Sequence, residues 1–486
     1  MRIRTSVFVL ILTGLSTIWT GCGGSGSQTP PPPPSTGATI QVVMTTGDRS
    51  RLLQTQPSTH FVSGTPGTTS VISVQPQSTY QQMDGFGASL TDSSAWVIWN
   101  NLDSAQQATL MQNLFDPAAG IGLSFLRQPM GASDFSASGN YSYDDMPSGE
   151  ADPDLVNFSV AHDDAYIVPL LQQAIARNSS LKVVALPWSP PAWMKSPESM
   201  NGGDINATYF PSLAQYFVRY VQAYGQRGIP IYAVSAQNEP LYSTSGYPTA
   251  SLPEDDEADF IANHLGPALA NAGLGSLKIL GYEHNWDNPG YAESLLASAA
   301  GSYLAGSSFH CYGGDVGAQA QVKTDYPNKD IWFTECTGTV GSNFSGDLVW
   351  NADHLLIGAT RNWARSISLW NLALDQNSGP TNGGCLSCRG VVTIDDNTNP
   401  ATITYNVEYY VLGHLSKFVK PGAVRIQSNT FEPVLDDVAF QNPDGSIALF
   451  VLNSANSSTT FSILTSGGWY LDYSLPAKSV ATFTWK

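Results

Sequence analysis

Between residues 81 and 375 the chain repeats one pattern eight times: a short apolar run followed by a segment long enough for a helix. Parallel strands need long, usually helical, crossovers, so this repeat predicts a parallel sheet with helices between its strands. Eight strands close most simply into a (β/α)₈ barrel. The runs are Met83–Leu90, Gly122–Met130, Leu181–Ser189, Ile231–Pro240, Leu277–Asn285, Tyr303–Gly313, Asp330–Gly338 and Ser366–Leu374. An open doubly wound sheet is the alternative, but no Gly-rich phosphate fingerprint follows the first run.

Both ends of the chain carry short alternating segments that favour β-strands. At the C-terminal end these are Ala423–Ser428, Asp437–Gln441, Ser446–Leu452, Thr459–Leu464 and Ser479–Lys486. Thr39–Met44 and Ser70–Val74 are similar segments before the first barrel run. We therefore expect a barrel over residues 81–415 and one β-sandwich built from residues 39–80 and 416–486.

The first 22 residues have the features of a signal peptide: a basic start, a short apolar core and small residues before Cys22. Thr20-Gly21-Cys22 resembles a bacterial lipoprotein cleavage site, which predicts lipidation of Cys22; a plain secretory signal cut nearby is the alternative. Residues 23–38 are rich in Gly, Ser and Pro and predict a linker. We expect a secreted protein, anchored by its lipid in a bacterial cell envelope.

The net charge of −18, with only 12% charged residues, makes nucleic acid and anionic lipid surfaces poor partners. A membrane contact is expected only through the N-terminal lipid. Cys385 and Cys388 form a single CxxC without the second ligand pair of a structural zinc site, so a local disulfide is predicted. Cys311 and Cys336 flank candidate active-site residues; buried free thiols are the simplest interpretation, and the sequence leaves open whether they are free. We expect no cofactor and no resident metal.

Side chains able to do chemistry gather at the C-terminal ends of the barrel runs. Barrel enzymes build their active sites at this end of the strands, so the pattern predicts one catalytic cleft. These residues are Arg127, Trp188, Asn238, Glu239, His284, His310, Glu335, Trp370 and Asn371.

Two of them, Glu239 and Glu335, end the fourth and seventh strands. Hydrolysis of a glycosidic bond needs one acid to protonate the leaving oxygen and one carboxylate to attack or to activate water, and in retaining enzymes the carboxyls lie about 5–5.5 Å apart. We expect ionised Glu335 to raise the pKa of Glu239, which keeps the acid protonated. Asn238 is placed to hydrogen-bond the sugar 2-hydroxyl.

Several long motifs in the right order resemble glycoside hydrolase family 30, the family of glucosylceramidases and β-1,6-glucanases. The resemblance runs from about Gln81 to the C-terminus. The matching stretches are Asp84–Ala88, Arg127–Phe135, Pro187–Lys195, Gln237–Pro240, Phe309–Tyr312 and Trp370–Leu374.

The resemblance implies a barrel with a β-sandwich and a retaining mechanism, with Glu239 as acid/base and Glu335 as nucleophile. It further implies that Asp134 and Trp188 hold the outer hydroxyls of the sugar, that Tyr312 hydrogen-bonds the nucleophile and that Trp370 lines the sugar platform. His310 is expected to position Glu335 or the sugar, although a purely structural histidine is equally compatible with the sequence. Arg127 is expected to orient the carboxylates, and Asn371 to contact substrate beside Trp370.

These features predict a retaining β-glycosidase acting on a β-linked glucan, glycoside or glycolipid, of the glucosylceramidase or β-1,6-glucanase type. A β-xylosidase or xylanase is the second possibility; the hydroxyl ligands Asp134 and Trp188 favour a hexose over it. A third possibility, a carbohydrate-binding surface protein with an inactive barrel, predicts a lost carboxylate, whereas both glutamates are present.

Overall fold

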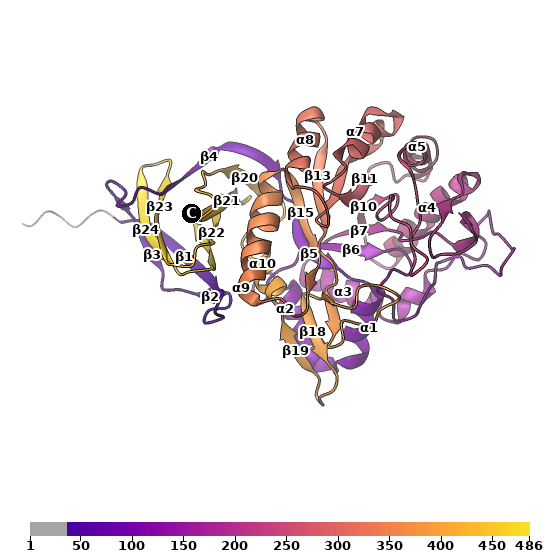
Figure 1. Cartoon of the computed structure of the whole chain (residues 1–486), viewed down its shortest axis with the longest axis horizontal. Coiled ribbons are helices and arrows are strands. Elements are labelled where there is room, and N and C mark those ends of the chain that lie inside the picture. The colour runs from indigo at the N-terminus through magenta and orange to yellow at the C-terminus, as the bar shows by residue number, and fades with distance from the viewer. Residues whose placement is uncertain (1–35) are drawn as a thin grey trace, which may run out of the picture. The chain divides into compact units, whose positions relative to one another are not determined.

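The computed structural model describes residues 36–486 (Figure 1). The expected signal peptide, Cys22 and all but the last three residues of the expected linker lie outside this range. Those three residues, from Thr36 to Ala38, belong to strand β1 (Thr36–Thr46).

Eight parallel strands close into a barrel in the order β10-β11-β12-β13-β15-β5-β6-β7. Each strand lies within or overlaps one of the eight predicted runs, which confirms the predicted barrel. The strands are β5 (Gly85–Ser89), β6 (Phe125–Pro129), β7 (Lys182–Leu186), β10 (Ile231–Ser235), β11 (Lys278–Asn285), β12 (Leu304–His310), β13 (Asp330–Glu335) and β15 (Ala364–Leu369). Most of their side chains are buried, as expected for a parallel sheet covered by helices.

Helices follow the barrel strands, and α4 illustrates why these segments are helical. Pro211 stands in its first turn, where a missing N–H costs nothing, and apolar residues recur on the face that packs on the barrel. The helices are α1 (Asp92–Asn101), α2 (Ser104–Phe115), α3 (Ile167–Arg177), α4 (Phe210–Gln226), α5 (Glu254–Asp259), α6 (Gly266–Asn271), α7 (Pro289–Ala297), α8 (Gly317–Asp325), α9 (Phe344–Trp350) and α10 (Val407–Ser416).

Short strands in the loops were not expected from the sequence. Three of them form a small sheet in the order β16-β18-β19, and two further pairs join β8 with β9 and β14 with β17. They are β8 (Lys195–Ser196), β9 (Asp204–Ile205), β14 (Gly338–Thr339), β16 (Ala373–Asp375), β17 (Cys388–Arg389), β18 (Val392–Asp395) and β19 (Thr402–Tyr405).

The β-sandwich combines strands from both ends of the chain, as predicted. Its strands run in the order β2-β1-β25-β22-β21-β20-β4-β23-β24-β3, and β1 also pairs with β3, so that the sheet folds back on itself. Besides β1 they are β2 (Gln54–Thr55), β3 (Thr59–Ser63), β4 (Val71–Gln82), β20 (Val424–Gln427), β21 (Leu435–Gln441), β22 (Ile447–Asn453), β23 (Thr459–Thr465), β24 (Trp469–Leu475) and β25 (Ser479–Trp485). The sequence did not predict β2, β3 or β24.

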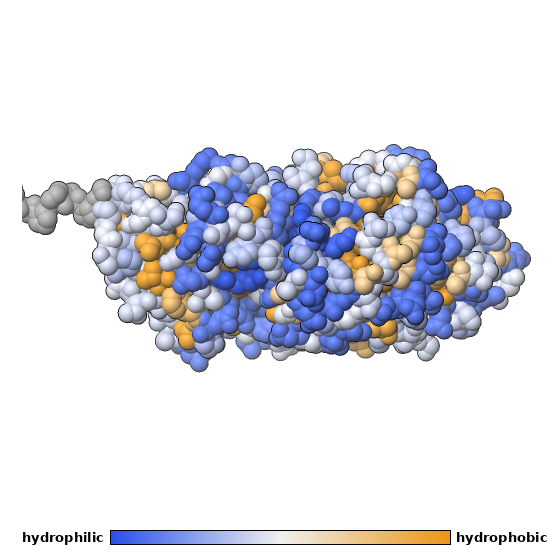
Figure 2. Space-filling model, turned by 90° about the horizontal axis from the view of Figure 1, so that it is seen from above, coloured by the Kyte–Doolittle hydropathy of each residue, from blue (hydrophilic) through white to orange (hydrophobic). Residues whose placement is uncertain are grey.

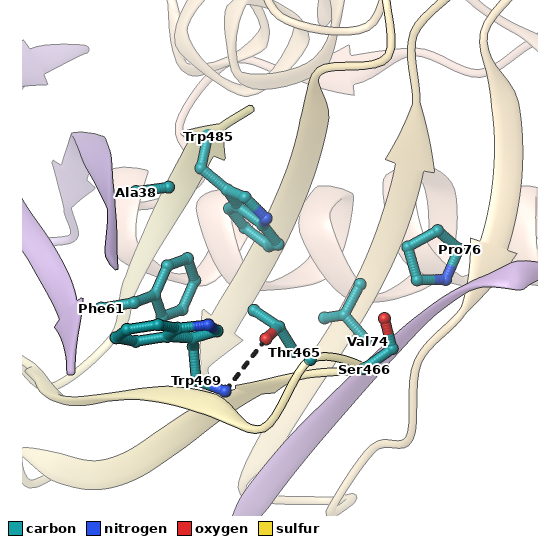
Figure 3. A pocket seen from close by; sticks show the side chains of 9 residues that line it. Ala38, Phe61, Val74, Pro76, Thr465, Ser466, Trp469 and Trp485 are labelled. Carbon is teal, nitrogen blue, oxygen red and sulfur yellow. Dashed lines mark hydrogen bonds between the residues drawn. The ribbon is translucent and has the colours of Figure 1, made fainter. Parts of the chain in front are cut away.

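An aromatic pocket of about 280 Å³ lies within the sandwich (Figure 3). Phe61, Trp469 and Trp485 provide its rings, and Phe61 meets Trp485 edge to face with 5.3 Å between ring centroids. The same three side chains belong to the sandwich core or pack against it. This pocket is separate from the residues at the C-terminal ends of the barrel strands.

The sandwich is joined to the barrel through helix α10, which stands between them in Figure 1. His414 of α10 is fully buried and hydrogen-bonds Thr45 of β1 and Thr482 of β25, each at 2.9 Å. Burial lowers the pKa of His414 to about 3, so the imidazole is neutral at this junction. The two parts therefore share buried polar contacts as well as apolar packing.

Among the residues that the structure describes, no helix is both long enough and apolar enough to span a membrane. On the face shown in Figure 2, hydrophilic residues predominate and the hydrophobic ones form small separate groups.

A buried carboxyl in helix α5 should make the stability of the folded protein depend on pH. Glu257 of α5 is 2% exposed and accepts hydrogen bonds from Tyr291 Oη at 2.7 Å and from the Tyr282 amide at 3.2 Å. Burial outweighs these hydrogen bonds and raises the pKa of Glu257 from 4.5 to about 7. Because the folded protein binds this proton more tightly than the unfolded chain, the stabilisation is complete below pH 4.5 and is lost as the pH rises through 7.

Glu257→Gln should therefore remove part of the fall in stability between pH 4.5 and pH 7, an effect of about 3 kcal/mol at most for a pKa shift of this size. Denaturant unfolding of both proteins at several pH values measures it. Asp255→Asn, an exposed change in the same helix turn, is the matched control. Parallel stability curves for wild type and Glu257→Gln would contradict the prediction.

Candidate active site

A pocket of about 250 Å³ opens at the C-terminal ends of the barrel strands. Most of the residues that line it were predicted from the sequence, namely Asp134, Trp188, Asn238, Glu239, Tyr312, Glu335 and Trp370. Tyr247, Thr337, Cys385 and Cys388 complete the lining. The strand ends therefore converge on a single cavity large enough for one sugar ring.

The fully buried guanidinium of Arg127, on strand β6, lies at the centre of this site. It donates from Nη1 to Glu335 Oε2 at 2.6 Å, from Nε to Glu283 Oε1 at 3.0 Å and from Nη2 to Asn238 Oδ1 at 2.6 Å. Burial would lower the pKa of Arg127, but the carboxylates of Glu335 and Glu283 raise it more. Arg127 thus stays charged and fixes three side chains from three other strands.

Both carboxylate oxygens of Glu335 accept hydrogen bonds. Arg127 occupies Oε2, and the hydroxyl of Tyr312 donates to Oε1 at 2.9 Å. The Tyr312 amide in turn donates to Asn285 Oδ1 at 3.1 Å, which anchors the loop after β12. Glu335 is 5% exposed, so its carboxylate has little freedom to turn away from the pocket.

Glu239 faces the same gap as Glu335. Nδ1 of His310 lies 3.1 Å from Glu239 Oε1 and 4.0 Å from Glu335 Oε1, so one imidazole nitrogen stands between the two carboxylates. The backbone of Glu239 has a φ of 44°, an uncommon conformation for a side-chain-bearing residue. Its amide donates to the Glu283 carbonyl at 3.0 Å, which supports this turn.

A bulge in β11 supplies two residues whose roles the sequence did not reveal. The register of β11 against β12 shifts between Tyr282 and His284, and Tyr282 and Glu283 both have positive φ. Glu283 consequently reaches Arg127, and Thr334 donates to its second oxygen at 3.0 Å. His284 approaches Glu239 instead, with 3.7 Å between Nδ1 and Oε1. The apolar pattern of β11 gives no sign of this extra residue.

The expected rise in the pKa of Glu239 is wrong. Burial raises the pKa of this carboxyl, but the imidazoles of His284 and His310 lower it more and hold it below its ordinary value. The raised carboxyl is Asp134, whose pKa lies well above its usual range because of burial and the charges of Glu335 and Glu239. The two glutamates thus raise the pKa of a third carboxyl, that of Asp134, while the two histidines lower the pKa of Glu239.

Two stacked indoles form one wall of the pocket. Trp188 and Trp370 lie with ring centroids 4.7 Å apart and planes 21° apart, and the Arg127 guanidinium lies over Trp188 at 4.7 Å. Asp134 lines the same cavity, and its Oδ1 atom is buried without a hydrogen-bond partner. Asn238 uses its oxygen on Arg127, which leaves its amide nitrogen as the donor at the pocket.

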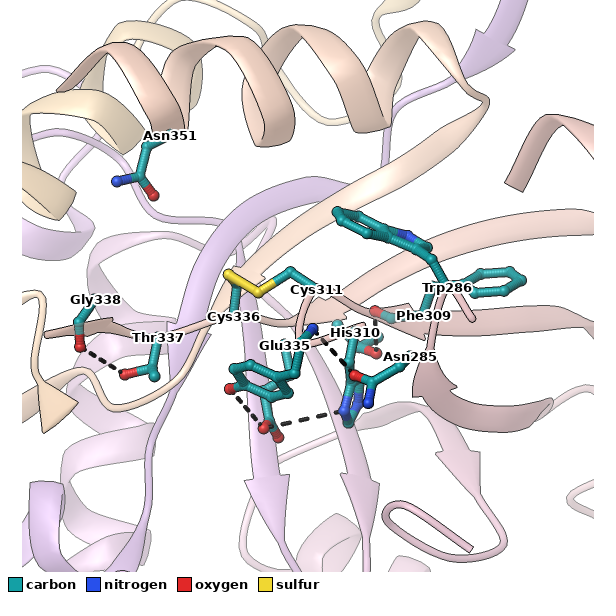
Figure 4. The surroundings of a disulfide bond; sticks show 12 residues. Asn285, Trp286, Phe309, His310, Cys311, Glu335, Cys336, Thr337, Gly338 and Asn351 are labelled. Atoms are coloured by element: carbon teal, nitrogen blue, oxygen red, sulfur yellow. Dashed lines mark hydrogen bonds and ion pairs between the residues drawn. A yellow bond between two sulfur atoms is a disulfide. The ribbon is translucent and has the colours of Figure 1, made fainter. Parts of the chain in front are cut away.

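Cys311 and Cys336, whose state the sequence left open with buried free thiols as the simplest interpretation, form a disulfide (Figure 4). They follow His310 and Glu335 on neighbouring strands, with Cα atoms 5.4 Å apart. The sequence separation of 25 residues conceals this proximity, which depends on the strand register. The predicted Cys385–Cys388 disulfide is present, and it lines the pocket.

Asn371 does not reach the pocket, contrary to expectation. It is fully buried, and its Oδ1 accepts a hydrogen bond from Thr91, the residue that caps helix α1, at 2.8 Å. The backbone turns at Asn371, with a φ of 68°, so its side chain points away from the cavity that Trp370 lines. Its role in the structure is to hold the loop after β15 against α1.

Comparison with known proteins agrees with this geometry. The sequence model of the glycosyl hydrolase family 30 TIM-barrel domain matches residues 83–419, and that of the family's β-sandwich domain matches residues 422–483. Endo-1,6-beta-D-glucanase BGN16.3 of Trichoderma harzianum is 34% identical over 83% of this chain and 84% of its own length. Lysosomal acid glucosylceramidase of Mus musculus is 30% identical over 86% and 84%. The solved structure of the endo-beta1,6-glucanase BT3312 superposes with a TM-score of 0.84 at 32% identity, over 92% of this chain and 99% of that one.

Proposed function

The chain belongs to glycosyl hydrolase family 30 and is a glycoside hydrolase, and we propose that its substrate is a β-1,6-linked glucan. We further propose that Glu335 is the nucleophile and Glu239 the acid/base of a retaining double displacement. The observation that carries these roles is the single His310 nitrogen lying within 4.0 Å of both carboxylates, because it places them across one gap.

In the first step a Glu335 oxygen attacks the anomeric carbon and forms an ester bond to it. The bond from that carbon to the leaving oxygen breaks, and the proton of Glu239 passes to that oxygen. In the second step water attacks the anomeric carbon, Glu239 accepts a proton from it, and the ester bond to Glu335 breaks. Arg127 and Tyr312 hold the carboxylate in place for both bond changes.

Glu239 must carry a proton when the first bond breaks, although its neighbours lower its pKa. Nδ1 of His310 lies 3.1 Å from the Glu239 Oε1 atom, within hydrogen-bond distance, whereas Nδ1 of His284 lies 3.7 Å away. Negative charge that develops on the leaving oxygen in the transition state raises the proton affinity of that oxygen, which favours transfer of the proton from Glu239 at that point.

The lining of the pocket favours a hexose. Asp134 presents a carboxyl oxygen without a protein partner, and the stacked indoles of Trp188 and Trp370 offer a sugar platform. A protonated Asp134 can donate one hydrogen bond and accept another, which suits contact with the outer hydroxyls of the sugar. Among the relatives described above, the glucanase is more similar in sequence than the glucosylceramidase, at 34% against 30%. This difference favours a glucan over a glycolipid.

We also propose that the enzyme is exported and lipidated at Cys22, with residues 23–35 as a spacer. The support comes from the sequence alone: the basic start, the short apolar core and the Thr20-Gly21-Cys22 motif. An anchored enzyme of this kind would act on glucan outside the cell.

The substrate proposal predicts release of reducing sugar from β-1,6-glucan at a higher kcat/KM than from laminarin, xylan or glucosylceramide. A hydrolysis panel of these four substrates, assayed at equal enzyme concentration, measures the ranking. Xylan or glucosylceramide as the best substrate would overturn the choice of glucan while leaving the two catalytic glutamates untouched.

Glu335→Gly should lower kcat by about 10⁴-fold or more, because the glycosyl ester cannot form without this carboxylate. Azide should then enter the vacated space, attack from the α face and give an α-glycosyl azide from an activated aryl β-glucoside. NMR of the product identifies the anomer, and wild-type enzyme with azide is the control. Full residual activity without azide would remove Glu335 from the mechanism.

Glu239→Ala should lower kcat/KM for β-1,6-glucan by about 10²–10⁴-fold, the usual contribution of a general acid. Hydrolysis of a dinitrophenyl β-glucoside should fall far less, since that leaving group departs without protonation. Steady-state kinetics on both substrates test this, with the surface change Glu150→Ala as control. Equal losses on the two substrates would contradict the acid role.

A further inference from the structure

Three nitrogen and oxygen atoms of the kind that bind zinc converge beside the pocket. They are one ring nitrogen each of His284 and His310 and a carboxylate oxygen of Glu239, and all lie within 4.8 Å of one another. Nδ1 is the nitrogen of each histidine that faces Glu239 Oε1. Two imidazoles and one carboxylate, with a fourth position open to water, form a common ligand set for Zn²⁺ in proteins. We propose that this cluster binds a divalent transition metal ion such as Zn²⁺ and that the bound ion inhibits the enzyme.

His284 is the residue that points to a ligand. Its Nδ1 atom is buried and has no hydrogen-bond partner, although it faces Glu239 Oε1 at 3.7 Å. That separation is too long for a hydrogen bond, whereas two atoms that share a metal ion are farther apart than two that share a proton. The unpartnered nitrogen therefore has the position of a metal ligand.

The local charge favours a cation. Glu239, Glu335 and Glu283 place three carboxylates around the site, against the single guanidinium of Arg127. Zn²⁺ prefers such a mixed set of nitrogen and oxygen ligands, whereas Mg²⁺ and Ca²⁺ prefer oxygen alone. Selective binding of transition metals over Mg²⁺ follows from this chemistry.

Metal binding has a cost at His310. Nη2 of Arg127 lies 3.4 Å from Nε2 of His310, and because an arginine can only donate, Nε2 accepts and Nδ1 carries the ring proton. Nδ1 donates that proton to Glu239, so a bound metal ion replaces the hydrogen bond between these two residues.

The inhibitory consequence rests on the proposed acid/base role of Glu239, whereas the binding itself does not. A metal ion on the Glu239 carboxylate occupies the oxygen that would protonate the leaving group. Zn²⁺ should thus inhibit hydrolysis of β-1,6-glucan more strongly than hydrolysis of a dinitrophenyl β-glucoside, and EDTA should reverse the inhibition.

Isothermal titration of the purified enzyme with ZnCl₂, repeated with MgCl₂, tests binding without reference to activity. We expect one Zn²⁺ per chain and no comparable Mg²⁺ binding. His284→Ala should weaken Zn²⁺ binding by about tenfold or more because it removes one of three ligands. His354→Ala is the matched control: it removes an exposed histidine whose only acidic neighbour within 4 Å, among the described residues, is Asp353. It should bind Zn²⁺ as wild type does.

A second measurement uses the wild-type enzyme alone and so does not depend on the folding of the His284 variant. Co²⁺ added to wild-type enzyme should give the visible absorption of a low-symmetry nitrogen–oxygen site, and Zn²⁺ should displace it. Absence of Zn²⁺ binding to a wild-type enzyme that hydrolyses β-1,6-glucan would overturn the metal proposal and leave the proposed function intact. Unchanged binding in a folded His284→Ala variant would overturn it as well.

Discussion

The buried guanidinium of Arg127 is the interaction on which the rest of the site depends. It links β6 to the ends of β10, β11 and β13 through Asn238, Glu283 and Glu335, and its face lies against Trp188. Removing one partner from a buried ionic network typically costs 3–5 kcal/mol, because the remaining charges lose their compensation. The arginine therefore stabilises the barrel end and aims the proposed nucleophile at the same time.

Backbone irregularities at the strand ends bring the carboxylate of Glu239 close to that of Glu335. Positive φ at Tyr282, Glu283 and Glu239 departs from the regular strand geometry, and the hydrogen bond from the Glu239 amide to the Glu283 carbonyl ties these positions together. Conformations of this kind cost about 1–3 kcal/mol each and persist where the surroundings determine them. Here the surroundings include Arg127 and Thr334, which hold the two carboxylate oxygens of Glu283.

The three carboxyls of the site have different environments, which suit them to different proposed roles. Glu335 receives hydrogen bonds from Arg127 and Tyr312, Glu239 is flanked by two imidazoles, and Asp134 is buried without a partner for one oxygen. The raised pKa of Asp134 favours a proton on that carboxyl, where it can serve sugar binding, whereas the two imidazoles lower the pKa of Glu239. The same imidazoles, with the Glu239 carboxylate, form the proposed metal-binding cluster.

The sequence by itself determined the barrel, the sandwich built from both chain ends and the strand-end position of Glu239 and Glu335, because periodicity and strand polarity are local properties of the chain. Arg127, Trp188 and Trp370 could be assigned to the site for the same reason. Tertiary structure alone decided the Cys311–Cys336 pairing, the inward turn of Glu283, the outward turn of Asn371 and the lowered pKa of Glu239. Each of these depends on the register between strands or on a bulge, and a one-residue shift that reverses a side chain leaves no trace in the apolar pattern.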